Sequence, residues 1–226
     1  MKEFLTIQEQ SDQRWIEYEI DPRTQILYQR EILQKEMDSW CLPHTVQNGR
    51  CIYEMDLQKS LERYGAKQPS VQEILKLLEA FDRQALISED ALLDRTRWCW
   101  DAACWSWDAD RQTLRGVYIP DRSFSSDRGV FLNGLSSQLM RFCLAEHWEN
   151  EETILFLHRL YRAGPELASE TLGLKEFIER ERENIAARSR MEEVAVIPET
   201  TLEPQKKKPR LLKLFFHRRQ VALPFG

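Results

Sequence analysis

Glycine is scarce in this chain, and its few copies are scattered. The 226 residues include eight glycines, and none of them forms the Gly-x-Gly-x-x-Gly or Walker pattern that brings backbone amides close to a phosphate. The stretch Gly134-Leu135-Ser136-Ser137 lacks the second glycine of a nucleophile elbow and falls within a predicted helix. The sequence therefore points neither to nucleotide hydrolysis nor to serine-hydrolase chemistry.

Residues that ligate metals are also few and poorly spaced. The four histidines lie far apart, and the five cysteines form neither Cys-x-x-Cys nor a paired Cys/His spacing. Cys99 and Cys104 come closest to such a pair, but no second ligand and no turn glycine lies between them. The odd cysteine count and the apolar neighbours predict reduced, buried thiols, and we expect no metal and no cofactor.

Long apolar runs are missing as well. No stretch approaches the ~20 residues that a membrane-spanning helix needs, and residues 1–9 lack the apolar segment and cleavage site of a secretion signal. Hydrophobic residues make up 42% and charged residues 31% of the chain, a balance typical of globular proteins. We therefore expect a cytoplasmic globular protein.

The first third of the chain carries the signals of strands. Residues 4–8 and 14–20 alternate apolar and polar side chains, and residues 44–55 contain Asn48-Gly49, the pair best suited to a two-residue hairpin turn. A helical spacing over residues 22–40 separates these two hairpins. We expect a strand-rich part with one helix over residues 1–66.

Helical spacing dominates the next part of the chain. Ser70 and Glu73 form a capping box ahead of an apolar stripe, which predicts a central buried helix. Three more helices are expected after residue 130; Gly164-Pro165 is predicted to end the second of them, whose His158 and Tyr161 face inward. This mostly helical part covers residues 67–185 and completes one α+β domain over residues 1–185.

Four of the seven tryptophans fall within ten residues. Trp98, Trp100, Trp105 and Trp107 lie two apart in each pair, which is the period of a strand. With a third run over residues 115–120, they predict a small hairpin or meander after the central helix. One pair should pack on that helix, and the more exposed pair is a candidate surface for a protein partner. Nucleic-acid stacking is disfavoured, because aspartates surround the cluster.

Paired carboxylates have structural explanations in this sequence. Glu151-Glu152 suit the first turn of a helix, and Asp108 and Asp110 suit a turn. A glycosidase needs two carboxylates that face each other across a cleft, an arrangement that one sequence leaves open. We therefore name no catalytic residue.

The C-terminal part of the chain has a different composition. Residues 186–205 offer few apolar anchors and are predicted to form a flexible linker. Residues 206–226, the basic tail, suit an anionic membrane surface, a protein partner, nucleic acid or a plain linker, and their apolar side chains favour the first two over nucleic acid. The candidate contact residues of the basic tail are Lys206, Lys207, Lys208, Arg210, Lys213, Phe215, Phe216, Arg218 and Arg219.

Several short phrases resemble an uncharacterised domain of Gram-positive bacteria that precedes a forkhead-associated (FHA) domain, a reader of phosphothreonine peptides. The resemblance covers about residues 14–180. Its phrases are Gln29-Arg30-Glu31-Ile32-Leu33, Gly49-Arg50-Cys51-Ile52-Tyr53-Glu54-Met55-Asp56, Lys59-Ser60-Leu61, Leu92-Leu93-Asp94 and Val117-Tyr118-Ile119-Pro120. An FHA domain does not fit into residues 194–226, so phosphopeptide binding by such a domain is not implied for this chain.

That domain is similar in layout to the pseudokinase-like cytoplasmic part of type VII secretion components. The similarity implies a pseudokinase-like α+β fold, with a strand-rich first half, a mostly helical second half and a small hairpin between helices. The sequence contains no His-Arg-Asp followed by Asn, no Asp-Phe-Gly, no Val-Ala-Ile-Lys and no glycine-rich loop. The resemblance therefore implies a kinase layout without kinase activity.

Together these features predict a non-enzymatic scaffold or interaction module. It would dock a protein partner in a bacterial signalling or envelope-assembly complex of the secretion or pilus type, and its basic tail would contact the inner face of the membrane. One alternative is an enzyme whose cleft, built from scattered carboxylates and tryptophans, acts on a sugar or a similar substrate. A second alternative is nucleic-acid binding through the basic tail.

Overall fold

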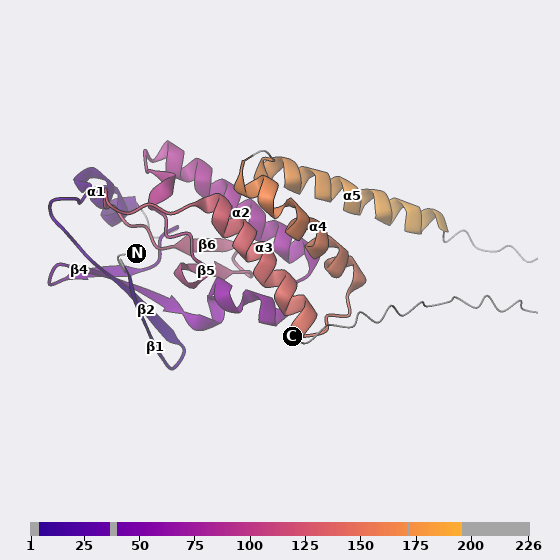
Figure 1. The fold of residues 1–226 in the computed structure, drawn as a ribbon, viewed down its shortest axis with the longest axis horizontal. Helices are drawn as coiled ribbons and strands as arrows, with labels where there is room; N and C mark the ends of the chain where they lie inside the picture. The colour runs from indigo at the N-terminus through magenta and orange to yellow at the C-terminus, as the bar shows by residue number, and fades with distance from the viewer. Residues whose placement is uncertain (1–4, 37–39, 171, 196–226) are drawn as a thin grey trace, which may run out of the picture. The chain divides into compact units, whose positions relative to one another are not determined.

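The computed structural model describes residues 5–36, 40–170 and 172–195. The protein is a mixed α+β structure in which a four-stranded sheet comes first in the chain and helices dominate the later part (Figure 1). Residues 1–186 form one compact unit, and residues 187–226 form a second. Within the described ranges, no helix is both long and apolar enough to cross a membrane.

The sheet is antiparallel, with the strand order β1-β2-β4-β3. Asn48 and Gly49 adopt positive φ angles of 52° and 76°, as a two-residue hairpin turn requires, and the predicted second hairpin is confirmed. Alternate residues of β2 and β4 are buried, so one face of the sheet packs on the core. The strands are β1 (Thr6–Gln10), β2 (Gln13–Glu19), β3 (His44–Gln47) and β4 (Arg50–Asp56).

The first helix, α1 (Leu27–Glu36), starts later than the sequence predicts. Residues 24–26 pair with a distant segment instead: the Ile26 amide donates to the Pro120 carbonyl at 2.8 Å, and the Arg122 amide donates to the Thr24 carbonyl at 2.9 Å. A tertiary pairing therefore replaces the first turn of the helix that was predicted over residues 22–40.

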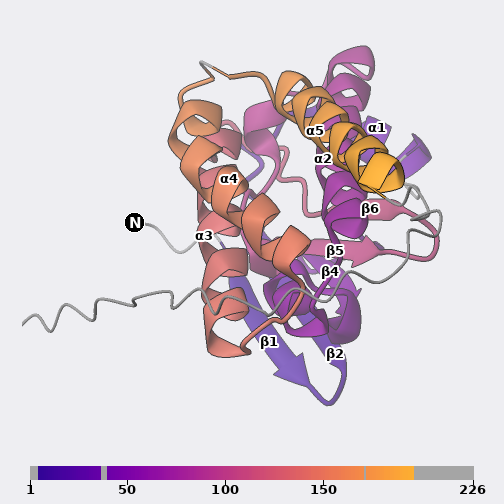
Figure 2. The same cartoon turned by 90° about the vertical axis from the view of Figure 1, so that its right-hand side faces the viewer.

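The central helix α2 (Val71–Asp90) matches its prediction closely. The Ser70 hydroxyl accepts from the Glu73 amide at 3.3 Å, and the Glu73 carboxylate accepts from the Ser70 amide at 2.7 Å, which closes the capping box. Its buried stripe includes Ile74, Leu78 and Phe81. Both ribbon views show α2 running alongside the β5–β6 hairpin, which comes directly after it in the chain (Figures 1 and 2).

That hairpin consists of β5 (Trp105–Asp108) and β6 (Thr113–Gly116). Two short 3₁₀ turns precede it, η3 (Arg95–Arg97) and η4 (Ala102–Cys104). Of the predicted hairpin or meander, the structure therefore has the hairpin, with irregular chain before it, because a 3₁₀ turn lies where the two tryptophan strands of a meander would have met.

Three helices complete the fold: α3 (Arg128–Ala145), α4 (Glu151–Ala168) and α5 (Leu174–Ala195). The α3 and α4 backbones approach closely, since a Cβ atom at Gly129 would lie 2.3 Å from the Ala168 carbonyl oxygen. Figure 2 shows these two helices side by side. The close approach requires glycine at position 129.

Helix α4 corrects two expectations. It continues past Pro165 to Ala168, because the missing proline amide only frees the carbonyl of Tyr161, a residue on the solvent side. His158 and Tyr161 are exposed rather than inward-facing, and Phe156, Leu157 and Leu160 fill the core instead.

Helix α5 also corrects the predicted linker. Residues 186–195 are helical, because alanine, arginine, methionine and glutamate favour helix even without packing. The rest of the predicted linker and the whole basic tail, with its candidate contact residues, lie outside the described residues.

Candidate functional site

All four clustered tryptophans are buried, so the expectation of an exposed pair for a protein partner is wrong. The exposed fractions are 0% for Trp98, 7% for Trp100, 0% for Trp105 and 3% for Trp107. The two tryptophan segments do not pair with each other. Both pair with the segment over residues 113–119, Trp105 opposite Gly116 and Trp98 in a single bridge to Tyr118. Both segments are thereby drawn into the core.

The rings of Trp98, Trp100 and Trp105 form one aromatic cluster with Phe81 of α2. Trp100 stacks on Trp105 with centroids 4.9 Å apart, and Phe81 of α2 meets Trp105 edge-on at 5.3 Å. Gly116 lies directly under Trp105, where a Cβ atom would approach the ring to 2.6 Å. This packing confirms the predicted contact between the tryptophans and the central helix.

Three of the four indoles have hydrogen-bond partners within the core. Trp98 Nε1 donates to Ser88 Oγ at 2.8 Å, and Trp100 Nε1 donates to the Arg95 carbonyl at 3.0 Å. Trp105 Nε1 donates to the Cys99 carbonyl at 2.7 Å. A ring as completely enclosed as Trp105 cannot stack on a sugar, so it cannot form the wall of the sugar-binding cleft that the enzyme alternative requires.

The aspartates around the cluster act in local structure. Asp94 and Asp101 cap the two 3₁₀ turns through bonds from backbone amides. Asp108 accepts from the Arg111 amide at 3.1 Å, which confirms its turn role, and from Lys59 Nζ at 2.6 Å. The bond from Lys59 holds the pKa of Asp108 below its usual value. These carboxylates are therefore engaged by the protein itself.

The sheet and the later part of residues 1–186 are joined directly. The Tyr53 hydroxyl on β4 donates to the Tyr118 carbonyl at 2.5 Å, and the Leu42 amide donates to the Gly116 carbonyl at 3.0 Å. A small hollow between the sheet and α1, whose lining includes Tyr53, Leu33 and Pro120, has a volume of about 10 Å³. That is room for roughly one water molecule.

Arg14 is the charged residue at this junction, and its side chain is 4% exposed. Its Nη1 donates to the Ala103 carbonyl at 2.9 Å, and its Nη2 donates to the Glu62 carboxylate at 2.6 Å. The Glu9 carboxylate accepts from the same guanidinium. Burial alone lowers the pKa of Arg14, but the bonds to these carboxylates outweigh it and raise the pKa.

The five cysteines are free and buried. Burial raises the pKa of Cys41 to about 12 and that of Cys51 to about 11, so both stay protonated thiols. The sulfur atoms of Cys99 and Cys104 lie 3.1 Å apart. Across the part of the chain that the structure describes, no group of three or more potential metal ligands is present.

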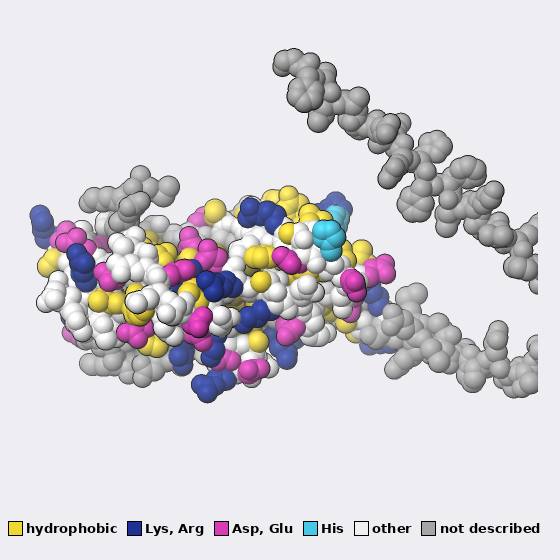
Figure 3. Space-filling model, turned by 90° about the horizontal axis from the view of Figure 1, so that it is seen from below, with side chains coloured by type: hydrophobic (Ala, Val, Ile, Leu, Met, Phe, Trp, Pro, Cys, Tyr) yellow, Lys and Arg dark blue, Asp and Glu magenta, His cyan; other side chains and the backbone are white. Residues whose placement is uncertain are grey.

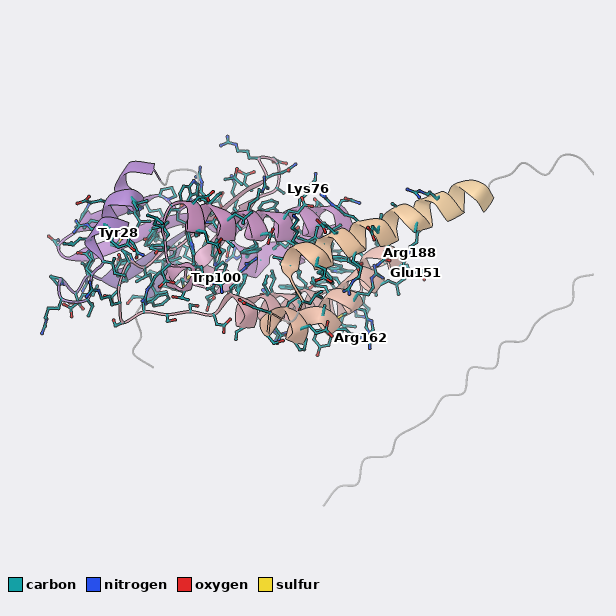
Figure 4. All side chains as sticks on the ribbon, turned by 90° about the horizontal axis from the view of Figure 1, so that it is seen from above. Tyr28, Lys76, Trp100, Glu151, Arg162 and Arg188 are labelled. Atoms are coloured by element: carbon teal, nitrogen blue, oxygen red, sulfur yellow. The ribbon has the colours of Figure 1, made fainter. Side chains whose placement is uncertain are left out.

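A polar hollow opens beside the aromatic cluster, and we call it the arginine hollow. Its volume is about 310 Å³, and a second hollow of the same volume shares Arg95, Arg128 and Glu170 with it. Figure 4 labels Trp100, the aromatic residue of the lining. The arginine hollow is lined by Arg95, Thr96, Trp100, Ser125, Ser126, Asp127, Arg128 and Glu170.

Distant parts of the chain position these side chains. Arg95 and Thr96 come from η3, Arg128 is the first residue of α3, and Glu170 follows α4. This site was not predicted from the sequence, because its residues are scattered over 76 positions. One signal was available in the sequence. The positive charge of an arginine at the start of a helix interacts unfavourably with the helix dipole, so a role other than helix stabilisation is indicated for such a residue.

The charges in the arginine hollow are poorly matched. Arg128 Nε and Nη2 are buried without a hydrogen-bond partner, and the Asp82 carboxylate lies 3.7 Å from Nη2, beyond hydrogen-bond distance. Burial lowers the pKa of Arg128, and the nearby charge of Arg95 acts in the same direction. Arg95 pairs with Glu170 at 3.4 Å.

The surface elsewhere is mixed in sign. On the face shown in Figure 3, basic and acidic side chains are interspersed. Among the described residues on this face, the basic side chains form no stripe of the kind that nucleic-acid-binding proteins present.

Comparison of the chain with family models, with curated proteins and with solved structures finds no match in any of the three.

Proposed function

We propose that this protein is a non-enzymatic interaction module, kinase-like in layout, that docks a protein partner in a bacterial signalling or envelope-assembly complex. The observation that carries the proposal is the closed junction between the sheet and the β5–β6 hairpin. In a kinase the nucleotide lies in the space between its sheet and the catalytic part that follows. Here the Leu42 amide donates to the Gly116 carbonyl and the Tyr53 hydroxyl donates to the Tyr118 carbonyl, so direct hydrogen bonds join the two sides.

The order of elements supports a kinase-like layout. Two strands, a helix and two more strands come first, then the long helix α2, then a two-stranded hairpin and further helices. This order corresponds to a strand-rich lobe followed by a helical lobe that carries the catalytic segments near a small hairpin. From this order we infer the layout alone, because the same order of elements is compatible with more than one function.

The two aspartates nearest to the catalytic positions of such a layout are engaged in local structure. Asp94, after α2, accepts from the Thr96 amide at 2.9 Å and the Thr96 hydroxyl at 2.7 Å. Asp121, after β6, is 5% exposed and accepts from the hydroxyls of Ser123 and Thr24, both at 2.6 Å. A kinase uses aspartates at such places as base and as magnesium ligand. Their engagement supports a role without phosphoryl transfer.

Nucleotide binding is the direct test of this proposal. Titration of the full chain with Mg-ATP in a calorimeter should release no heat beyond dilution, and incubation with γ-labelled ATP should label neither the chain nor a generic acceptor protein. Saturable binding of Mg-ATP, or transfer of label that a chelator abolishes, would contradict the non-enzymatic proposal.

We further propose that the basic tail brings the module to the anionic inner face of the membrane. Lys206, Lys207, Lys208 and Arg210 supply charge, and Phe215 with its apolar neighbours supplies an insertable side. The full chain should sediment with phosphatidylglycerol-containing vesicles and not with phosphatidylcholine vesicles.

A full-length variant with glutamine at Lys206, Lys207, Lys208 and Arg210 should lose this binding. Glutamine at four exposed basic residues of the folded part, Arg23, Arg63, Arg111 and Arg162, is the matched control. Equal and negligible binding by all three proteins overturns the membrane proposal. Steeply salt-dependent retention of the native chain on DNA would favour the nucleic-acid alternative.

A further inference from the structure

Arg128 is a partly buried arginine, and two of its three nitrogen atoms have no hydrogen-bond partner. Its side chain is 18% exposed, and its Nε and Nη2 atoms lack any hydrogen-bond partner. Arginine carries five N–H donors in a planar fork that matches an oxyanion. Buried polar groups in proteins are almost always paired, and an exception calls for an explanation such as an unseen ligand.

Arg14, an arginine buried more deeply than Arg128, shows that this chain can satisfy such a group. Arg14 donates to Glu9, to Glu62 and to the Ala103 carbonyl, while the nearest acid to Arg128 stays beyond hydrogen-bond distance. Single unpaired nitrogen atoms also occur at Arg97 and Arg115, but among the described residues Arg128 is the arginine with two of them.

A second guanidinium and a hydroxyl line the same space. Arg95 is close enough for its charge to act on Arg128. The Ser126 hydroxyl accepts from the Trp100 amide at 3.1 Å and, among the described residues, donates to no acceptor. The amides of the first α3 turn are not free, because the Asp127 carboxylate accepts from Gly129 at 2.7 Å and Val130 at 3.1 Å. A ligand here would be held by side chains.

We propose that the arginine hollow binds a phosphoryl group between the guanidinium groups of Arg95 and Arg128, with the Ser126 hydroxyl as a further donor. A phosphate monoester carries about −1.5 to −2 charges at pH 7 and three acceptor oxygens, which suits two arginines better than a single carboxylate does. The volume of about 310 Å³ lies at the lower end of the ~300–1,000 Å³ typical of ligand pockets, which fits a small anionic group.

Glu170 acts as an internal competitor for this ligand. It pairs with Arg95 at 3.4 Å, and the two side chains are 69% and 48% exposed, so the pair is weak and easily exchanged. An incoming phosphoryl group would displace the Glu170 carboxylate from Arg95, and the Arg128 side chain would turn toward it, because its unpaired Nε and Nη2 atoms are enclosed by the protein.

The source of the phosphoryl group rests on the proposed function, since a docking module would meet it on a phosphorylated side chain of its protein partner. Free phosphate and nucleotides offer the same chemistry. Binding of the phosphoryl group itself does not depend on the proposed function and is tested separately from its source.

The first experiment follows the arginine Nε–Hε signals of the ¹⁵N-labelled full chain by NMR. Inorganic phosphate is the probe, and sodium chloride at equal ionic strength is the reference. We expect the Arg128 and Arg95 signals, assigned through the lysine variant at each position, to shift saturably with phosphate alone. Equal shifts with sodium chloride overturn the proposal.

Variants then separate binding from folding. Arg128→Met should weaken phosphate binding at least about tenfold, because hydrogen bonds to charged groups are the strong ones. Glu170→Gln, at an exposed position, should strengthen it roughly two- to fivefold, the range expected for release from a surface ion pair. Arg162→Gln removes one charge from an exposed site outside the arginine hollow and should leave binding unchanged.

Unchanged phosphate affinity in both Arg128→Met and Glu170→Gln overturns the proposal, even if the first variant folds poorly. A final arm compares phosphothreonine peptides with their unphosphorylated forms and with AMP. Tighter binding of the phosphorylated peptides supports the partner as source. Phosphate binding without any preference for them overturns that source while the phosphoryl site stands. Mg-ATP turnover, by contrast, would contradict only the non-enzymatic function.

Discussion

Two regions of this domain differ in how an arginine is paired: the junction between the sheet and the β5–β6 hairpin, and the arginine hollow. Arg14, at the junction, gives its donors to two carboxylates and a carbonyl, and its pKa is raised. Arg128, in the arginine hollow, leaves two nitrogen atoms without partners, and its pKa is lowered. At the junction the arginine is paired, which stabilises the fold. In the arginine hollow the unpaired donors of Arg128 lower the stability, and a bound ligand that pairs with them would remove this free-energy cost.

Removal of a ring from the aromatic cluster should have the largest effect on stability. Trp105→Ala deletes a completely buried indole and its bond to the Cys99 carbonyl, and we expect a loss of about 3–5 kcal/mol in the free energy of unfolding. Urea denaturation measures it. Leu144→Ala, at a side chain that is 70% exposed, is the control and should cost less than about 0.5 kcal/mol. A loss below 1 kcal/mol for Trp105→Ala would show that the cluster is not part of the stable core.

The two arginines can be compared by the same substitution. Arg14→Met leaves two partly exposed carboxylates and a carbonyl without their partner, and should cost about 2–3 kcal/mol. Arg128→Met removes a buried, poorly paired charge, and should change stability by less than about 1 kcal/mol or increase it. Denaturation midpoints at constant m-value provide the measurement. Equal losses in both variants would remove the contrast between the two regions.

Two glycines of α3 test the helix contact beside the arginine hollow. Gly129→Ala places a methyl group against the Ala168 backbone, which cannot move aside as a flexible side chain can, and should cost about 1–3 kcal/mol. Gly134→Ala meets nothing within 4 Å and should stabilise the same helix by about 0.5–1 kcal/mol. Thermal and urea unfolding of both variants measures these changes. The same sign in both would contradict the close approach of α3 and α4.

The smallest expected effect depends on pH. Burial raises the pKa of Asp121, but bonds from Ser123 and Thr24 outweigh it and hold the pKa below the ordinary 3.8. Its stabilising contribution is therefore complete above pH 3.8 and is lost as the pH falls through the lower folded value. Asp121→Asn should cost about 1 kcal/mol at pH 7 and flatten the decline of stability below pH 4.

Asp110→Asn, at an exposed turn residue, serves as the control for this measurement. Urea denaturation at several pH values from neutral to acid gives the two profiles. An acid decline in Asp121→Asn as steep as in the native chain would assign the effect to other carboxylates.

Local signals in the sequence predicted the parts of the fold that local interactions control. Asn48-Gly49 fixed the second hairpin, and Ser70 with Glu73 fixed the start of α2, because turn geometry and capping act over a few residues. The start of α1 and the passage of α4 through Pro165 were mispredicted, since pairing with residues 120–122 and solvent exposure decide them.

The tryptophans show the same division between local and tertiary information. Their spacing correctly indicated an extended chain with aromatic side chains for the core. It did not reveal that both pairs lie against one segment, residues 113–119, and that this arrangement buries all four rings. A period of two assigns side chains to faces, but which faces are covered depends on the partners.

By itself, the sequence determined the α+β class, the two hairpin turns and the central helix, because periodicity, turn residues and caps are local. Only the tertiary structure brought Arg95 and Arg128 to one hollow and left the donors of Arg128 unpaired. Positions 33 residues apart carry no joint pattern, and a missing hydrogen bond becomes visible only when every neighbour of the group is in place.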